Sequence, residues 1–405
     1  MAIASPALAA DEQAVLDTYM DIAQAGYADS LATASTMAEA IDRLIAEPSE
    51  KALDEARDAW RAARVPYQQT EVYRFGNPIV DEWEGKVNAW PLDEGLIDYV
   101  DYGGATDVNP YGAMNIIASP VLEMSGREID ASAITPELIR DLHELDGIEA
   151  NVTSGYHAIE FLLWGQDLSG TGEGSGARPA TDFDTANCTH GNCDRRAEYL
   201  QAATDLLLSD LEWMAKAWAP GGAARQELEA KGTDGGIITI LTGMGSLSYG
   251  EQAGERMKLG LLLNDPEEEH DCFSDNTHNS HFYDGLGIRN VYLGRYVRAN
   301  GEVIEGPSVS DLVAEIDPEV DARLRDSLDD TIMALTAIKT VAEAGTAYDQ
   351  LLAPGNAAGG ALIQAAIDAL VAQTREIERA VAALELQPIA FEGSDSLDNP
   401  SAVFQ

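Results

Sequence analysis

The chain has 405 residues, of which 45% are hydrophobic, so it is long enough for two or three domains with sizeable cores. Its 70 Asp and Glu residues outnumber its 25 Lys and Arg residues, which gives a formal net charge of −45. This charge argues against nucleic acids and anionic membrane surfaces as partners. Because the carboxylates are spread along the whole chain, we interpret most of them as an adaptation to high salt, which screens their repulsion.

The first ten residues resemble the end of a secretory signal peptide. They contain the small-residue pattern Ala7-Leu8-Ala9 and precede Asp11 and Glu12. We therefore predict that residues 1–10 are the residual end of a signal and that the protein is exported. No other run approaches the roughly 18 apolar residues of a membrane-spanning helix, so we predict no transmembrane segment.

Apolar residues recur at helical spacing along most of the sequence. Ser49 is a suitable N-cap for the first clear amphipathic helix, which carries Leu53 and Trp60. Similar apolar stripes follow in residues 200–218, 324–338 and 363–384. Strand-like alternation is scarce, so the pattern predicts an all-α fold made of helical bundles.

Two long ordered loops, residues 72–130 and 165–195, are rich in glycine and proline and interrupt the helices. The second loop separates two halves of similar length. We expect an N-terminal bundle over residues 11–195, a C-terminal bundle over residues 196–390 and a tail over residues 391–405.

Weak internal similarity suggests that the two halves arose by duplication. Residues 67–71 loosely match residues 249–252, and residues 157–165 loosely match residues 281–294. Repeats of this kind favour a tandem duplication of one bundle.

The most informative motif is Gly155-Tyr156-His157-Ala158-Ile159-Glu160, followed by the apolar run 161–164. His157 and Glu160 are three residues apart, so a helix places them on one face. Such a pair at the edge of a helical core can present two metal ligands. The alternative interpretation is a buried histidine paired with a nearby carboxylate.

Cys188 and Cys193 enclose a short turn that contains His190. In an oxidising compartment this spacing predicts a local disulfide. A metal knuckle that uses His190 is the alternative, but no second cysteine pair exists to complete it. Cys272 is expected to be a packed or free thiol.

Glycines recur between residues 243 and 254 within a predicted helix. The Gly-Lys-Ser/Thr ending of a phosphate loop is absent, so close helix–helix packing is the better interpretation. Glu251, Glu255 and Arg256 are expected to form a buried ion network between the bundles.

A second polar cluster contains His270, Asp271, Asp275, His278 and His281, although the whole chain has only six histidines. We interpret His270, Asp275, His278 and His281 as a candidate second metal site or as the wall of a cleft between the domains. The structural alternative is an N-cap and turn.

The motif Gly155-x-His157-x-x-Glu160 with the run that ends at Gly165 resembles the signature of the imelysin family. Residues 245–257 resemble a motif of the second half of that family. Residues 268–278 and 287–292 are similar to its iron-regulated branch, and the resemblance extends from about residue 12 to about residue 385.

This resemblance implies two related four-helix bundles, export to the periplasm or outer membrane of a bacterium, and a link to iron acquisition. It also implies a peptidase label of the M75 type. A zinc peptidase places His-Glu-x-x-His on one helix. Here positions 153 and 161 are Thr and Phe, so the residues give proteolysis little support.

Metal binding without hydrolysis needs fewer groups, because iron accepts one imidazole with several carboxylates. The predicted metal ligands are His157, Glu160, Glu71 and Asp93. For Glu71 and Asp93, the alternative interpretation is that they are solvated carboxylates. Iron is the expected ion, with zinc or another divalent ion as the alternative.

The sequence therefore predicts an exported, imelysin-like, iron-regulated protein that binds a metal ion and serves in iron uptake. Its expected partners are a metal ion or iron chelate and an iron transporter of the inner or outer membrane. One alternative is a metallopeptidase that uses His157 and Glu160. The other is a non-catalytic binder of a peptide, glycan or iron chelate in the groove between the bundles.

Overall fold

The computed structural model describes residues 11–101 and 109–404, and these are mainly helical. The predicted all-α class is confirmed, because the described strands form only two short antiparallel hairpins. The hairpins pair β1 (Val121–Met124) with β2 (Arg127–Asp130) and β3 (Arg295–Val297) with β4 (Val303–Glu305). The predicted signal-peptide end, residues 1–10, lies outside the described residues.

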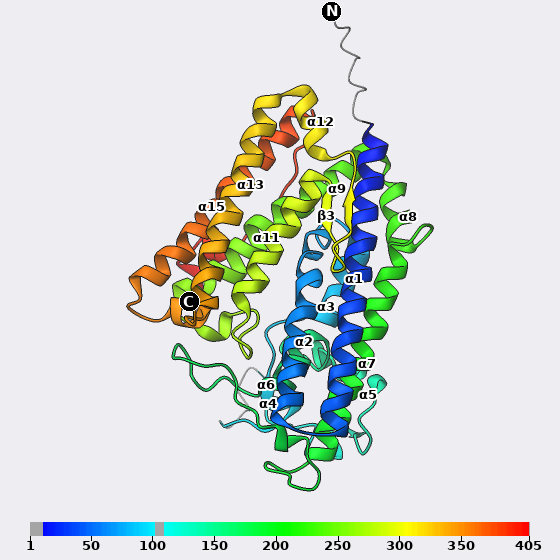
Figure 1. Cartoon of the computed structure of the whole chain (residues 1–405), viewed down its shortest axis with the longest axis vertical. Helices are drawn as coiled ribbons and strands as arrows, with labels where there is room; N and C mark the ends of the chain where they lie inside the picture. Colours follow the sequence, from blue (N-terminus) through cyan, green and yellow to red (C-terminus); the bar gives the residue numbers. More distant parts are fainter. Residues whose placement is uncertain (1–10, 102–108, 405) are drawn as a thin grey trace, which may run out of the picture.

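The N-terminal part is organised around three helices, α1 (Glu12–Ala46), α2 (Glu50–Gln68) and α7 (Cys193–Ala217). The helix α1 packs lengthwise against both α2 and α7 (Figure 1). Ser49 caps α2 by accepting a hydrogen bond from Ala52 N, as predicted. The shorter helices α3 (Pro78–Asn88) and α6 (Gly155–Trp164) pack against this group.

The C-terminal part contains α9 (Gly232–Ser246), which continues as the π-helix η4 (Leu247–Lys258) and then as α10 (Leu259–Leu263). The helices α11 (Thr277–Leu293) and α15 (Ala357–Ala383) pack beside it, and α13 (Pro318–Glu343) packs against both of them. The wider turns of η4 change which side chains face the neighbouring helices, and such turns are frequent at functional sites.

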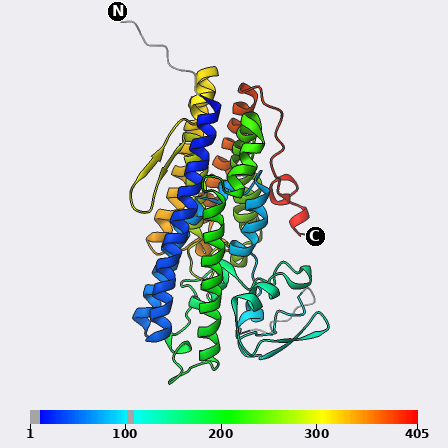
Figure 2. The same cartoon turned by 90° about the vertical axis from the view of Figure 1, so that its right-hand side faces the viewer.

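Shorter elements complete the chain. They are α4 (Glu94–Ile97), α5 (Pro136–Leu142), α8 (Ala223–Ala230), α12 (Val309–Ile316), α14 (Tyr348–Leu352), α16 (Asp395–Asp398), η1 (Glu71–Tyr73), η2 (Leu145–Gly147), η3 (Ala180–Asp182), η5 (Pro266–Glu268) and η6 (Ala402–Phe404). Figure 2 shows that the long loops of the N-terminal part gather at the end of the molecule opposite α12. None of the described helices has the length and hydropathy of a membrane span.

The core is shared between the two parts of the chain. The larger hydrophobic cluster runs from Val15 to Val381, while a smaller one contains only residues between Ala253 and Leu370. The helix α7, which begins at the predicted boundary near residue 195, packs on α1 and α6. The division into residues 11–195 and 196–390 stays a prediction.

The glycines of residues 243–254 allow close packing, but only Gly243 packs against a helical element, with Val72 O of η1 2.2 Å from where its Cβ would lie. A Cβ on Gly245 would lie 2.3 Å from the ring of Phe391, and one on Gly250 would lie 2.6 Å from the carbonyl oxygen of Glu392. The predicted helix–helix contact is therefore replaced here by a contact with the C-terminal segment.

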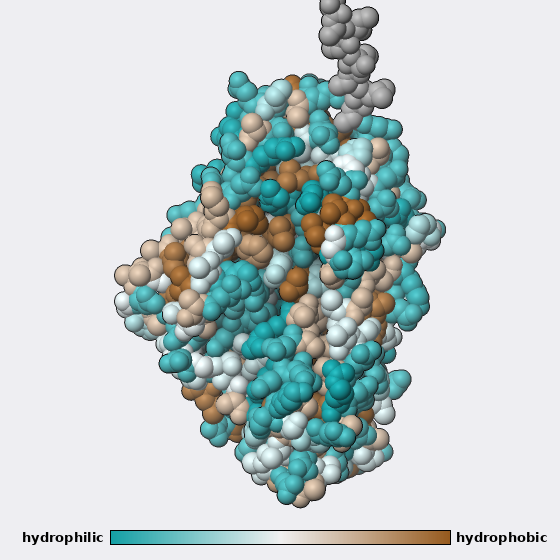
Figure 3. Space-filling view, viewed as in Figure 1, coloured by the Kyte–Doolittle hydropathy of each residue, from teal (hydrophilic) through white to brown (hydrophobic). Residues whose placement is uncertain are grey.

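Hydrophilic residues cover most of the face shown in Figure 3, and hydrophobic patches gather in its upper half.

Candidate metal centre

The helix α6 buries His157 and Glu160 completely. It begins at Gly155, whose φ is +86° and whose Cβ would lie 2.5 Å from the carbonyl oxygen of Val87. Only glycine fits this close approach. The predicted shared face brings His157 Nδ1 to 3.0 Å from Glu160 Oε2.

Two further side chains reach His157 from the loop between η5 and α11. His157, His270 and Asp271 each offer one ligand atom, and these three atoms lie within 4.8 Å of one another. All three residues are buried. The imidazole rings of His157 and His270 lie 4.8 Å apart between centroids, and Trp90 packs against His157. We call this group the buried centre.

Neighbouring residues orient Asp271. Arg64 Nη2 donates to its Oδ1 at 2.7 Å, and Asn276 and Ser280 donate to its Oδ2 at 2.7 and 2.6 Å. Burial opposes the ionisation of Asp271, but the charge of Arg64 and the hydrogen bonds from Ser280 and Asn276 together outweigh it, so the pKa of Asp271 is lowered. The buried centre therefore contains one carboxylate that is negatively charged at neutral pH.

Glu160 is held from both sides. Its Oε1 accepts hydrogen bonds from Ser274 N at 3.0 Å and from Ser274 Oγ at 2.6 Å, while its Oε2 faces His157. A carboxylate in this position fixes the ring orientation of a metal-binding histidine. Burial, followed by the charge of Asp271, raises the pKa of Glu160 well above its ordinary value.

Both histidines of the buried centre are neutral. Burial, reinforced by Arg64, lowers the pKa of His157 to about 3, and burial with Arg256 lowers the pKa of His270 well below its ordinary value. Neutral imidazole is the form that binds metal ions. His270 has only long contacts, 3.4 Å from Gln68 Nε2 and 3.5 Å from Asn88 Nδ2, so a metal ion could replace them at low cost.

The buried nitrogen His157 Nε2 has no hydrogen-bond partner among the described residues. A buried polar atom in this state is unfavourable. A metal ion bound at Nε2 would favour ionised Glu160, because Glu160 then accepts from Nδ1–H and leaves the Nε2 lone pair free. The donor set of two neutral imidazoles and one carboxylate therefore fits a divalent transition metal.

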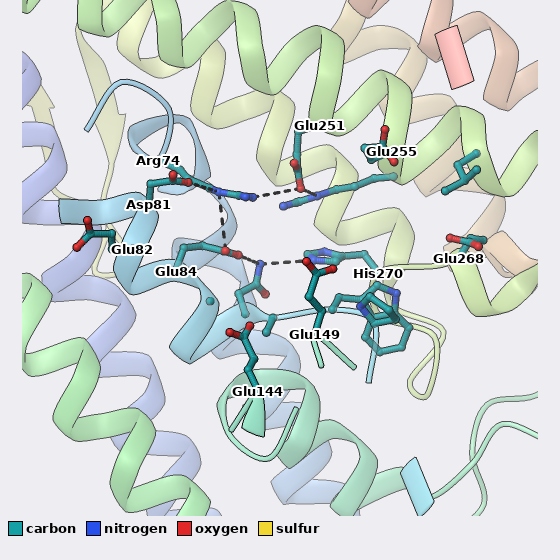
Figure 4. A pocket seen from close by; sticks show the side chains of 17 residues that line it. Arg74, Asp81, Glu82, Glu84, Glu144, Glu149, Glu251, Glu255, Glu268 and His270 are labelled. Carbon is teal, nitrogen blue, oxygen red and sulfur yellow. Dashed lines mark hydrogen bonds and ion pairs between the residues drawn. The ribbon is translucent and has the colours of Figure 1, made fainter. Parts of the chain in front are cut away.

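A cavity of about 660 Å³ leads to the buried centre, and His270 lies on its wall (Figure 4). Among the described residues, only Arg74 and Arg256 give this lining a positive charge. Its acidic lining residues are Asp81, Glu82, Glu84, Glu144, Glu149, Glu251, Glu255 and Glu268. Such a lining attracts cations and raises their local concentration.

Glu71 and Asp93 do not join the three ligand residues. Arg256 Nη2 binds Glu71 Oε2 at 2.7 Å, and Arg256 also pairs with Glu251 and Asp284. The predicted buried ion network at Arg256 therefore exists with Glu251, but Glu71 and Asp284 take the place predicted for Glu255, which is exposed. Asp93 is half-buried and accepts a hydrogen bond from Asn109 at 2.5 Å.

The predicted second cluster is divided among several places. His270 joins His157, whereas Asp275 lies with Asp167 and Asp349. His281 stacks on Tyr348 with ring centroids 5.0 Å apart. His278 Nε2 lies 3.1 Å from Asn279 Nδ2. The sequence showed that this segment is rich in potential ligands but not that His270 and Asp271 face the His-x-x-Glu motif.

The predicted disulfide between Cys188 and Cys193 is confirmed. His190 instead binds Asp182 at 2.7 Å, so the alternative of a metal knuckle is wrong. Cys272 is free and buried.

Comparisons with known proteins agree with the predicted family. The family model described as Imelysin (Peptidase_M75) matches residues 23–377. Iron-regulated protein A of Synechococcus elongatus is 30% identical over 82 residues, which are 20% of this chain and 21% of that protein. The matched segment thus spans about a fifth of the length of this curated relative.

A crystal structure of a candidate iron-regulated protein A precursor from Parabacteroides distasonis has a similar fold. Its TM-score is 0.66 at 20% identity, and the match covers 94% of this chain and 97% of that chain. At this identity the likeness concerns the fold alone.

Proposed function

Because the chain belongs to the imelysin family, we propose that it is an exported protein of the iron-regulated type, which binds a metal ion and takes part in iron uptake. The ion is iron, and its ligands are His157, His270 and Asp271. The printed names of the two relatives supply the link to iron.

The observation that carries this proposal is the buried centre with its unpartnered His157 Nε2. The two imidazoles and the carboxylate of Asp271 hold the ion. Glu160 holds the ring of His157, and Arg64 and Ser280 hold the carboxylate of Asp271. Iron accepts such a mixed nitrogen and oxygen ligand set, as do zinc and other divalent ions.

The acidic cavity supports a role in capturing cations. Its carboxylates concentrate metal ions, and His270 connects the cavity to the buried centre. A protein that captures iron outside the cytoplasm needs a transporter to pass it on. We therefore propose an iron transporter of the inner or outer membrane as the partner, with the metal ion or an iron chelate as cargo.

Metal analysis of the purified protein tests the proposal. The wild type should bind about one equivalent of iron, and His157→Ala and His270→Gln should each lose it. His190→Ala is the matched control, because His190 lies outside the buried centre, and it should keep the iron. Full iron content in His157→Ala would disprove the assignment of these ligands.

The peptidase alternative has one observation in its favour, a glutamate with a raised pKa beside the buried centre. Both carboxylate oxygens of Glu160 are occupied by Ser274 and His157, however, which leaves neither free to activate water. If the metal-loaded protein cleaved a protein substrate and Glu160→Gln abolished the cleavage, the peptidase would replace our proposal. A larger ligand that stayed bound after His157→Ala would instead indicate a binder in the groove.

A further inference from the structure

A second group of ligand atoms lies apart from the buried centre. Carboxylate oxygens of Asp167, Asp275 and Asp349 lie within 4.8 Å of one another. Asp167 belongs to the loop after α6, Asp275 precedes α11, and Asp349 is in α14. Three segments that are distant in sequence therefore bring three acidic groups to one point, which we call the Asp349 cluster.

Within the described part of the chain, Asp349 has no hydrogen-bond partner, whereas Asp167 accepts a hydrogen bond from Ser169 N at 2.8 Å. Only 2% of its surface is exposed, yet neither carboxylate oxygen has a hydrogen bond of acceptable geometry. The backbone N–H groups of Asp349 and Gln350 are near enough to lower its pKa but are poorly aligned. Among the described residues, no Lys, Arg or His forms an ion pair with Asp167, Asp275 or Asp349. Arg61, which influences Asp275 at a distance, pairs with Asp58.

Bringing these carboxylates together without a cation is unfavourable. Burial, together with the charge of neighbouring aspartates, raises the pKa of Asp349 to about 6 and the pKa of Asp275 to about 7. Buried negative charges of this kind are stabilised in proteins when they are paired or bind a metal ion.

We infer that Asp167, Asp275 and Asp349 bind one calcium ion. Calcium takes oxygen ligands at about 2.3–2.6 Å, so two of its ligands can lie up to about 5 Å apart, which agrees with the observed separations. The cluster offers carboxylates without imidazole or thiolate, as hard cations require. Magnesium is usually held by one or two carboxylates and several waters, so three converging carboxylates favour calcium.

The ion would fasten the glycine-rich loop to the C-terminal helices. Near the cluster, Gly176 N already donates to Phe273 O at 2.9 Å, and Ser274 next to Asp275 binds Glu160. Calcium would therefore hold in place the segment that carries His270, Asp271 and Ser274. This inference does not depend on the proposed iron site, because it uses different ligands.

The test uses the full chain, first freed of metal with a chelator and then titrated with calcium chloride at constant ionic strength. Calcium should raise the melting temperature of the wild type by several degrees. Asp349→Asn and Asp275→Asn should bind calcium at least about tenfold more weakly and should lose this shift. Asn is suitable at position 275, because it tolerates the left-handed backbone there, whose φ is 55°.

Glu173→Gln is the matched control, since it removes one negative charge from the same loop at an exposed position. It should respond to calcium as the wild type does. Asp349→Asn should melt at or above the wild type without calcium and below it with calcium, a reversal that loss of packing would not produce. The inference would be overturned if both Asn variants showed the same calcium-induced rise in melting temperature as the wild type. It would also be overturned if magnesium raised the melting temperature of the wild type as much as calcium does.

The two proposals can fail separately. His157→Ala should lose iron but keep the calcium response, whereas Asp349→Asn should lose the calcium response but keep its iron. Loss of the calcium response in His157→Ala would show that the ion does not bind at the Asp349 cluster.

Discussion

Two groups of aspartates in this protein, each with at least one buried member, have opposite surroundings. Asp98 is bound by Arg196 Nε at 2.6 Å and by Arg178 Nη1 at 2.8 Å, and Arg178 also binds Asp182. The Asp349 cluster has no such cation among the described residues. In a chain with 25 Lys and Arg residues for 70 carboxylates, arginines neutralise some buried aspartates and leave Asp349 without a counter-charge.

The pKa values express the same contrast. Burial opposes the ionisation of Asp98, but Arg178 and Arg196 outweigh burial and lower its pKa. Without an arginine, burial raises the pKa of Asp349 to about 6. Asp271 is intermediate, since it has one arginine partner, Arg64, and two neutral histidines beside it. A buried carboxylate is therefore a candidate ligand where the chain does not supply its counter-charge.

The largest expected effect concerns Asp98 and Asp182, which we call the arginine-paired group. Asp98→Asn removes the charge that Arg178 and Arg196 share, so two buried guanidinium groups lose a common partner. We expect the free energy of unfolding to fall by about 3–5 kcal/mol, measured by urea denaturation. Arg289→Ala breaks the solvent-accessible ion pair with Asp329 and should change the free energy of unfolding by less than about 1 kcal/mol. Equal effects of the two substitutions would remove the distinction between buried and exposed pairs.

The disulfide beside the arginine-paired group should have a smaller effect. Arg196 Nη1 donates to Gly191 O, which lies inside the loop closed by Cys188 and Cys193. Replacing both cysteines by alanine should lower the free energy of unfolding by about 2 kcal/mol, because the closed loop is short. Reductant should destabilise the wild type to the same extent and leave the double variant unchanged.

The smallest effect has the opposite sign. In calcium-free solution at pH 7, Asp349→Asn should be more stable than the wild type by about 1–2 kcal/mol, because it relieves a buried, unpaired charge. The folded pKa of Asp349, about 6, lies above its unfolded value. The wild type should therefore lose stability relative to this variant as the pH rises from about 4 to about 6.

The same pH series distinguishes the two groups of aspartates. The folded pKa of Asp98 lies below its unfolded value, so its contribution is present above about pH 4 and is lost as the pH falls further. The difference in free energy of unfolding between the wild type and Asp98→Asn should therefore decrease as the pH falls below about 4. If the free energies of unfolding of Asp98→Asn and Asp349→Asn, each relative to the wild type, changed with pH in the same direction, the contrast between the two groups of aspartates would be refuted.

Much of the fold could be predicted because its signals are local. The apolar stripes of residues 200–218, 324–338 and 363–384 correspond to α7, α13 and α15, and Ser49 caps α2. The spacing of His157 and Glu160 likewise follows from one turn of a helix. The neighbours of the glycines near residue 245 were predicted wrongly, because a sequence does not show which distant segment approaches a helix.

The all-α class, the helix that presents His157 and Glu160, the disulfide and the excess of carboxylates could all be predicted from the amino-acid sequence. The folded structure was needed to show that His270 and Asp271 meet His157, that Arg256 pairs with Glu71, and that Asp275 joins Asp167 and Asp349. Helix periodicity depends on neighbours within a few residues, so a sequence displays it directly. The partner of a buried charge depends instead on which segments the folded core brings together.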